Sequence, residues 1–218
     1  MAYHLNAETI SLEDLEKRIK TTDLVPSRLS LLEGLDKKLG KLGKYGLGNL
    51  ADLRNAMKTT KKLDSLTQAT GIEKEYLVLL RREVNSYFPK PFPLKSFDWL
   101  PEEVIKNLEK AGIKNTAQFY ENIIEPKKTK NLRASLQIKD EVFQQISCLC
   151  DLTRIQWTSP LAARMFFDAG YDSVKKIASA DPDIFCNALD ELNADNRYFK
   201  GKIGLRDIKR LTNSAAYL

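Results

Sequence analysis

A short motif that joins two helices constrains this 218-residue chain more than any other feature of its sequence. In each copy a glycine is followed by an apolar residue, one residue of any kind, and then Asn or Ser. Glycine readily adopts the left-handed conformation that ends a helix, and Asn or Ser can cap the next helix by accepting a hydrogen bond from a backbone N–H. The copies begin at Gly46, Gly112 and Gly170. Three copies predict a tandem array of short helices.

The hydrophobic pattern between these joints favours an all-α fold. Apolar residues recur every three or four positions, as in Val104, Ile105 and Leu108, which predicts one buried face per helix. No long segment alternates with the two-residue period of a strand. We therefore expect an all-α protein built of short helices and tight turns.

A proline-rich run near the middle of the chain predicts a division into two parts. Residues 88–93 read Phe-Pro-Lys-Pro-Phe-Pro. Proline has no N–H to donate and pushes the residue before it into an extended conformation, so this run is not helical. We expect N-terminal helices and a first repeat in residues 1–88, a linker in residues 89–93, and a second and third repeat in residues 94–218.

The composition argues against catalysis and against metal binding. The chain has one histidine, His4, and three cysteines, Cys148, Cys150 and Cys186, whose spacing predicts neither a disulfide framework nor a zinc site. Buried apolar positions in a reduced compartment suit these cysteines better. The sequence also has no phosphate-binding glycine loop and no nucleophile elbow. We expect no enzyme activity and no cofactor or small-molecule substrate.

Because no apolar run is long enough to cross a membrane, we expect a cytoplasmic protein.

Two runs of the chain carry a family resemblance. The segments Gly46–Glu83 and Asp151–Leu211 resemble an uncharacterised bacterial family of tandem helix-hairpin-helix repeats, known only as a domain of unknown function. The resemblance implies a SAM-like or helix-hairpin-helix architecture, related to modules that hold nucleic-acid backbones in DNA repair and replication. In such modules, glycines in an apolar-Gly-apolar-Gly hairpin let backbone N–H groups reach a phosphate. Here only the first hairpin keeps a glycine, Gly34, whereas Trp99 and Trp157 stand in the other two, where we expect them to anchor packing.

Basic residues concentrate just after the glycine of the first hairpin. The segment from Gly34 to Lys62 has eight basic residues against two acidic ones, an excess equal to the net charge of +6 of the whole chain. Lys37, Lys41 and Lys44 follow a spacing of four and three, so they are predicted to share one helix face. The predicted nucleic-acid site comprises Gly34, Lys37, Lys38, Lys41 and Lys44.

Two functions remain open at this level. The first is non-catalytic, sequence-independent binding of a DNA or RNA backbone through the basic first repeat. The alternative is a protein-interaction or scaffold module whose degenerate hairpins bind no nucleic acid, in which case the lysines form only a solvated helix face. A second basic cluster is predicted to lie on a solvated turn: Lys127, Lys128, Lys130 and Arg133.

Overall fold

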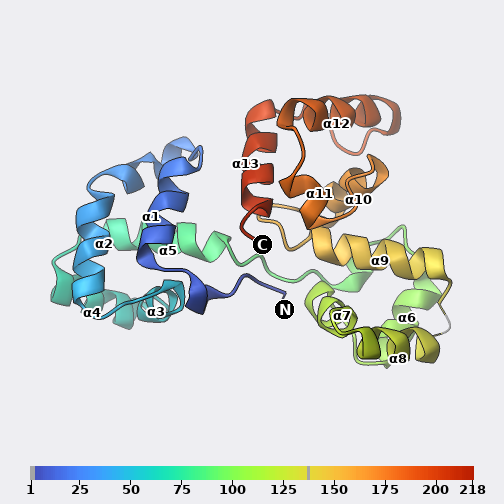
Figure 1. The fold of residues 1–218 in the computed structure, drawn as a ribbon, viewed down its shortest axis with the longest axis horizontal. Helices are drawn as coiled ribbons and strands as arrows, with labels where there is room; N and C mark the ends of the chain where they lie inside the picture. Colours follow the sequence, from blue (N-terminus) through green and yellow to red (C-terminus); the bar gives the residue numbers. More distant parts are fainter. Residues whose placement is uncertain (1–2, 137) are drawn as a thin grey trace. The chain divides into compact units, whose positions relative to one another are not determined.

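The computed structural model describes residues 3–136 and 138–218 of the chain, and these residues are all-helical (Figure 1). Within them there is no strand, and the only β-type pairing is two isolated backbone bridges, Ser11 with Asn49 and Pro93 with Asn115. The prediction of an all-α fold is therefore confirmed. The described residues form two compact units. The first unit is Leu5–Phe88, and the second unit is Pro89–Leu218 together with Tyr3 and His4.

The first unit is a cluster of short helices around a core made mainly of leucine. Its elements are η1 (Ala7–Thr9), α1 (Leu12–Thr21), η2 (Pro26–Leu32), α2 (Leu35–Lys44), α3 (Leu50–Ala56), α4 (Thr60–Thr70) and α5 (Lys74–Ser86), where η marks a 3₁₀ helix. Helix α5 packs against η2, α3 and α4, while α1 packs against α2. Leu15, Leu35, Leu53 and Leu77 are fully buried between them.

The second unit has its own core, which is richer in aromatic residues. Its elements are η3 (Leu94–Ser96), α6 (Glu102–Lys110), α7 (Thr116–Ile123), α8 (Pro126–Leu136), α9 (Asp140–Leu152), α10 (Pro160–Asp168), α11 (Val174–Ala178), α12 (Pro182–Asn196) and α13 (Leu205–Ala215). Helix α9 packs against α7 and α10, and α13 packs against α11 and α12. Phe97, Phe119 and Phe185 are buried in this core.

The predicted helix joint is present in all three copies. Its glycines have φ values of 99° at Gly46, 83° at Gly112 and 85° at Gly170, all in the left-handed region. After Gly112, the next backbone N–H donates to the carbonyl oxygen five residues earlier at 2.9 Å, a hydrogen bond typical of a helix end. The Asn115 side chain then accepts a hydrogen bond from the backbone N–H three residues on and caps α7. Each joint therefore ends one helix and starts the next through its own backbone and capping side chain.

The segment after Pro26 differs from its prediction. The sequence predicts a helix with Leu29, Leu32 and Leu35 as its apolar stripe, but the segment is the 3₁₀ helix η2, whose buried residue is Leu31. Of the predicted stripe only Leu35 is buried, and it belongs to α2. A 3₁₀ helix has three residues per turn, so Leu29 and Leu32 share a side. That side faces solvent, with Leu29 51% and Leu32 44% exposed.

The sequence predicts polar turns at residues 59–62 and 125–130, but these segments form the starts of helices α4 and α8. Thr59 caps α4 by accepting a hydrogen bond from a backbone N–H, and Pro126 begins α8. Proline is compatible with the first helical position because the N–H it lacks would have no helical partner there. The second basic cluster therefore lies on α8 and not on a turn: Lys127, Lys128, Lys130 and Arg133. The sequence also predicts a short helix that starts at Pro182 with Ile184 on its apolar side, but α12 continues to Asn196 and Ile184 is exposed.

Candidate functional site

Gly34 begins α2 and leaves the first turn of this helix open. Its φ of 62° and ψ of 31° are left-handed, and an added Cβ would meet no atom within 4 Å. No side chain caps the N-terminus of α2. The first N–H groups of an uncapped helix have no helical partner, and together with the helix dipole they attract anions.

Three of the predicted lysines form one exposed surface on α2. Lys37, Lys41 and Lys44 are all exposed, and we call this set the lysine face. It lies opposite the buried side of the helix, which carries Leu35, Leu39 and Leu42. Among the described residues, no carboxylate oxygen lies within 4.0 Å of any of these three ammonium groups. The lysine face is therefore a patch of positive charge without direct ion pairs to the carboxylates that the structure describes, although Asp36 stands in the first turn of the same helix.

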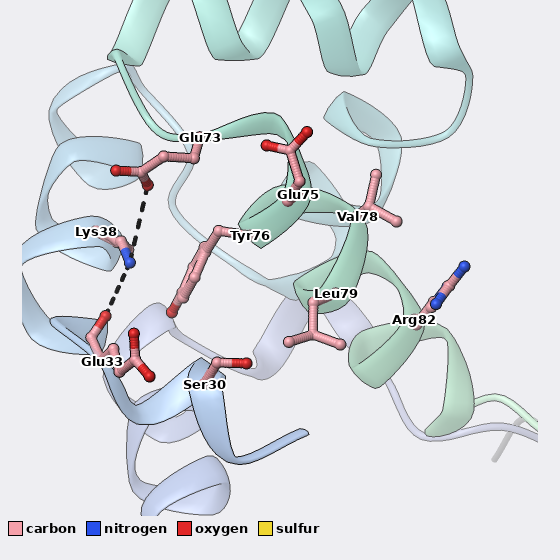
Figure 2. A pocket seen from close by; sticks show the side chains of 9 residues that line it. All are labelled: Ser30, Glu33, Lys38, Glu73, Glu75, Tyr76, Val78, Leu79 and Arg82. Atoms are coloured by element: carbon pink, nitrogen blue, oxygen red, sulfur yellow. Dashed lines mark hydrogen bonds and ion pairs between the residues drawn. The ribbon is translucent and has the colours of Figure 1, made fainter. Parts of the chain in front are cut away.

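Lys38 lies away from the lysine face. Its ammonium nitrogen donates to the carbonyl oxygen of Glu33 at 2.9 Å, pairs with a carboxylate oxygen of Glu73 at 3.9 Å, and lies 3.8 Å from the centre of the Tyr76 ring. Figure 2 shows the ammonium between these two acceptors and beside the ring. The structure thus separates Lys38 from the other predicted lysines, because its charge is already balanced within the first unit.

The pocket around Lys38 carries mixed charge. It encloses about 390 Å³ and is lined by Ser30, Glu33, Lys38, Glu73, Glu75, Tyr76, Val78, Leu79 and Arg82 (Figure 2). Three of these residues are acidic and two are basic. The Tyr76 hydroxyl donates to the carbonyl oxygen of Leu31 at 2.8 Å, and burial, with a smaller contribution from Glu73, raises the pKa of this phenol. The charge balance makes this side of the Gly34 hairpin a poor place for a phosphate.

A second groove lies at the other end of α2, and we call it the Tyr45 groove. It encloses about 530 Å³ and is lined by Tyr45, Ala56, Thr59, Lys61, Lys62, Ser65 and Leu66. Tyr45 is 50% exposed. The sequence prediction did not include this tyrosine, although its position four residues after Lys41 places it on the neighbouring part of the same helix surface.

The other two hairpins differ from each other. Trp99 packs edge-on against Phe97 with ring centres 5.5 Å apart, in agreement with its predicted packing role. Trp157 does not bear out the same prediction, because it is 50% exposed and has a left-handed φ of 68°. The guanidinium of Arg210 lies 4.5 Å from its ring centre. Both tryptophans stand 13 positions before a joint glycine, so equal spacing in the sequence does not imply equal burial.

Arg154, which precedes the third hairpin, holds together a buried network in the second unit. It donates to the carbonyl oxygen of Tyr3 at 2.8 Å and to the Asp151 carboxylate at 2.6 Å, and its guanidinium lies 4.2 Å from the Tyr120 ring centre. The buried Tyr3 hydroxyl is 2.9 Å from the hydroxyl oxygen of Thr116. Arg154 is therefore a structural residue. Nothing in the periodicity of the sequence points to this role for Tyr3.

The three cysteines are buried, and no metal-binding cluster occurs in the described part of the chain. Cys148, Cys150 and Cys186 are buried free thiols, as predicted, and burial raises the pKa of each. Within residues 3–136 and 138–218, no group of three or more His, Cys, Asp or Glu side chains is placed to hold a metal ion. No helix in these ranges is both long and apolar enough to span a membrane.

Comparison with known protein families gave a match to the second unit. The model of the family described as Domain of unknown function (DUF4332) matches residues 100–218. Neither the curated proteins nor the solved structures include a match to the chain. The matched residues lie in the second unit, whereas the lysine face and the Tyr45 groove lie in the first.

Proposed function

The chain belongs to the DUF4332 family, and we propose that it is a non-catalytic module that binds nucleic-acid backbones without reading their sequence. In this proposal the first unit acts as a helix-hairpin-helix repeat, and either DNA or RNA is its partner. The observation that carries the proposal is the lysine face, in which three exposed ammonium groups have no carboxylate partner among the described residues.

The lysine face suits a phosphate backbone for electrostatic reasons. Lysine ammonium groups bind phosphates as point charges, and each contact releases a counterion from the nucleic acid. Such contacts position the protein on the backbone but carry no sequence information. Lys37, Lys41 and Lys44 repeat along about two turns of α2, which suits a row of phosphates better than a single anion.

The charges around the hairpin indicate the direction of approach. On the side of Lys38, the Glu73 carboxylate pairs with the ammonium group, which also donates to the backbone carbonyl oxygen of Glu33. The carboxylates of Glu33 and Glu75 add further negative charge to this pocket. On the opposite side, the open first turn of α2 and the lysine face both favour an anion. We therefore place Gly34, Lys37, Lys41 and Lys44 in the proposed interface and leave Lys38 outside it.

A specific observation also supports the alternative of a protein-interaction module. Leu29 and Leu32 expose about half of their surfaces on one side of η2, beside the mixed-charge pocket that includes Ser30 and Leu79. Exposed aliphatic residues bordered by polar groups are common in protein interfaces. If the first unit recognises a protein, we expect this surface to take part.

The decisive experiment compares backbone binding by two variants of equal charge. Fluorescently labelled duplex and single-stranded 20-nucleotide DNA are titrated at about 50 mM and about 200 mM salt and followed by anisotropy. The test variant replaces Lys37, Lys41 and Lys44 with glutamate. The control replaces Lys127, Lys128 and Lys130 on α8 with glutamate, so both variants reduce the formal net charge from +6 to zero.

The proposal predicts that only the variant of the lysine face loses affinity. The loss of three phosphate contacts should also reduce the slope of log affinity against log salt by about 2 to 3. Equal losses in both variants would indicate a general charge effect, and no wild-type binding at low salt would refute the proposal. In that case, a partner captured from nuclease-treated extract by the wild type but not by a Leu29→Ser, Leu32→Ser variant would support the protein-interaction alternative.

A further inference from the structure

We propose that the Tyr45 groove holds an unpaired base of a single-stranded nucleic acid, stacked on the Tyr45 ring, while neighbouring lysines hold the adjacent phosphates. This inference rests on the proposed function and extends it. The lysine face accounts for affinity toward any nucleic-acid backbone, whereas the Tyr45 groove adds a preference for single strands.

The first argument is the state of the Tyr45 side chain. It is 50% exposed at the C-terminal end of α2, in a groove whose lining also includes Ala56 and the buried Leu66. An exposed aromatic ring beside an apolar surface suits the flat face of a base. Stacking of this kind tolerates any sequence because every base has a π-face. A base paired within a duplex is already stacked and does not enter such a groove.

The second argument is the charge of the groove. Lys61 and Lys62 are exposed in its lining, and among the described residues no carboxylate oxygen lies within 4.0 Å of either ammonium group. The nearest acidic residue in sequence, Asp64, pairs instead with Lys74 at 2.6 Å. The first turn of α4 contains no acidic residue, so two lysines stand at the positive end of a helix dipole. An anionic partner relieves this accumulation of positive charge.

The third argument is the continuity of the groove with the lysine face. Lys37, Lys41 and Tyr45 lie four residues apart on α2, so consecutive members are about 6 Å apart along the helix axis. The basic stripe therefore leads from the open start of α2 toward the groove. A polynucleotide can occupy both the stripe and the groove, while a single nucleotide reaches only one of them.

The test uses two oligonucleotides that differ only in their bases. One is a fluorescently labelled 20-nucleotide strand of thymidine, and the other is an abasic strand with the same number of phosphates. We expect the wild-type chain to bind the thymidine strand about tenfold more tightly than the abasic strand. Tyr45→Ala should abolish this ratio and leave affinity for the abasic strand unchanged, and Tyr45→Phe should preserve the ratio.

Two further variants locate the effect. Lys61→Gln combined with Lys62→Gln should weaken binding of both strands and reduce the salt slope by about 1.4, since two phosphate contacts are lost. Trp157→Ala serves as the matched control, because Trp157 is another aromatic residue with 50% exposure but lies in the second unit, and it should leave the ratio unchanged. Far-UV circular dichroism verifies that each variant is folded.

The outcomes separate this inference from the proposed function. Equal wild-type binding of the thymidine and abasic strands, or a ratio that survives Tyr45→Ala, would overturn the inference and leave backbone binding standing. A ratio abolished by Trp157→Ala and not by Tyr45→Ala would also overturn it. The absence of binding to every strand at low salt would remove both proposals.

Discussion

Two glycines, one inside α2 and one in the joint that follows it, should respond to alanine in opposite directions. Gly46 ends α2 with a φ of 99°, whereas Gly40 lies inside α2 with an ordinary helical backbone. An added Cβ would meet no atom within 4 Å at either position. Neither alanine variant should therefore clash with neighbouring atoms, and the two variants differ only in how well alanine tolerates the backbone conformation at each position.

The expected magnitudes follow from that preference. Holding an L-residue in the left-handed region costs about 1–2 kcal/mol, so Gly46→Ala should destabilise the first unit by that amount. Replacing an exposed glycine inside a helix by alanine gains about 0.8–1 kcal/mol, so Gly40→Ala should stabilise it. The two alanine variants should therefore differ by about 2–3 kcal/mol.

Urea unfolding followed by far-UV circular dichroism measures this difference. With a denaturant slope of about 2 kcal/mol per molar, the midpoints of the two variants should lie about 1–1.5 M apart. Trp99 and Trp157 both belong to the second unit, so tryptophan fluorescence gives an independent record of that unit. The reasoning is refuted if Gly46→Ala leaves the midpoint unchanged, or if Gly40→Ala lowers it as much as Gly46→Ala does.

Three further predictions concern the second unit and are measured by urea unfolding followed by tryptophan fluorescence. Tyr3→Phe removes the hydroxyl bonded to Thr116 and should cost about 1–2 kcal/mol, so an unchanged midpoint would contradict the buried position of Tyr3. Arg154→Met leaves the Asp151 carboxylate without its cation and should cost about 3 kcal/mol, with little recovery in Arg154→Lys, because lysine lacks the planar guanidinium. Burial raises the pKa of the Cys150 thiol above 9.0, so above that pH the unfolded thiol ionises first. The stability contributed by Cys150 should thus be constant below about pH 8 and fall by about 1.4 kcal/mol per pH unit above pH 9, and Cys150→Ala should flatten this decline.

The features that the sequence predicted well are local ones. Each of the three joints is defined by a glycine and a capping residue within four positions of sequence. The lysine face is defined by the helical period within the ten residues of α2. Both signals are complete within one short segment, so neither needs knowledge of the tertiary fold. The all-α class follows for the same reason.

The features that sequence reasoning missed depend on contacts between distant residues. Lys38 was grouped with its neighbours, but its charge is balanced by Glu73, 35 positions later. The Tyr45 groove forms where the end of α2 meets the end of α3 and the first half of α4, and no single segment encodes it. Tyr3 is buried through Thr116, 113 positions away. For Trp157 the error is the opposite one: its place in a hairpin predicts a packing role, whereas the side chain is 50% exposed.

The position of Tyr3 has a consequence for how the chain can be divided into fragments. The second unit includes Tyr3 and His4, which precede the first unit in the sequence, and Pro89–Leu218, which follow it. The first unit is therefore an insertion in the sequence of the second, and Tyr3 is a fully buried residue on the far side of that insertion. A fragment that begins at Pro89 lacks this residue, and one that begins at Leu100, where the family match starts, also lacks the buried Leu94 and Phe97. The family match therefore covers only part of the second unit and leaves out residues that belong to its core.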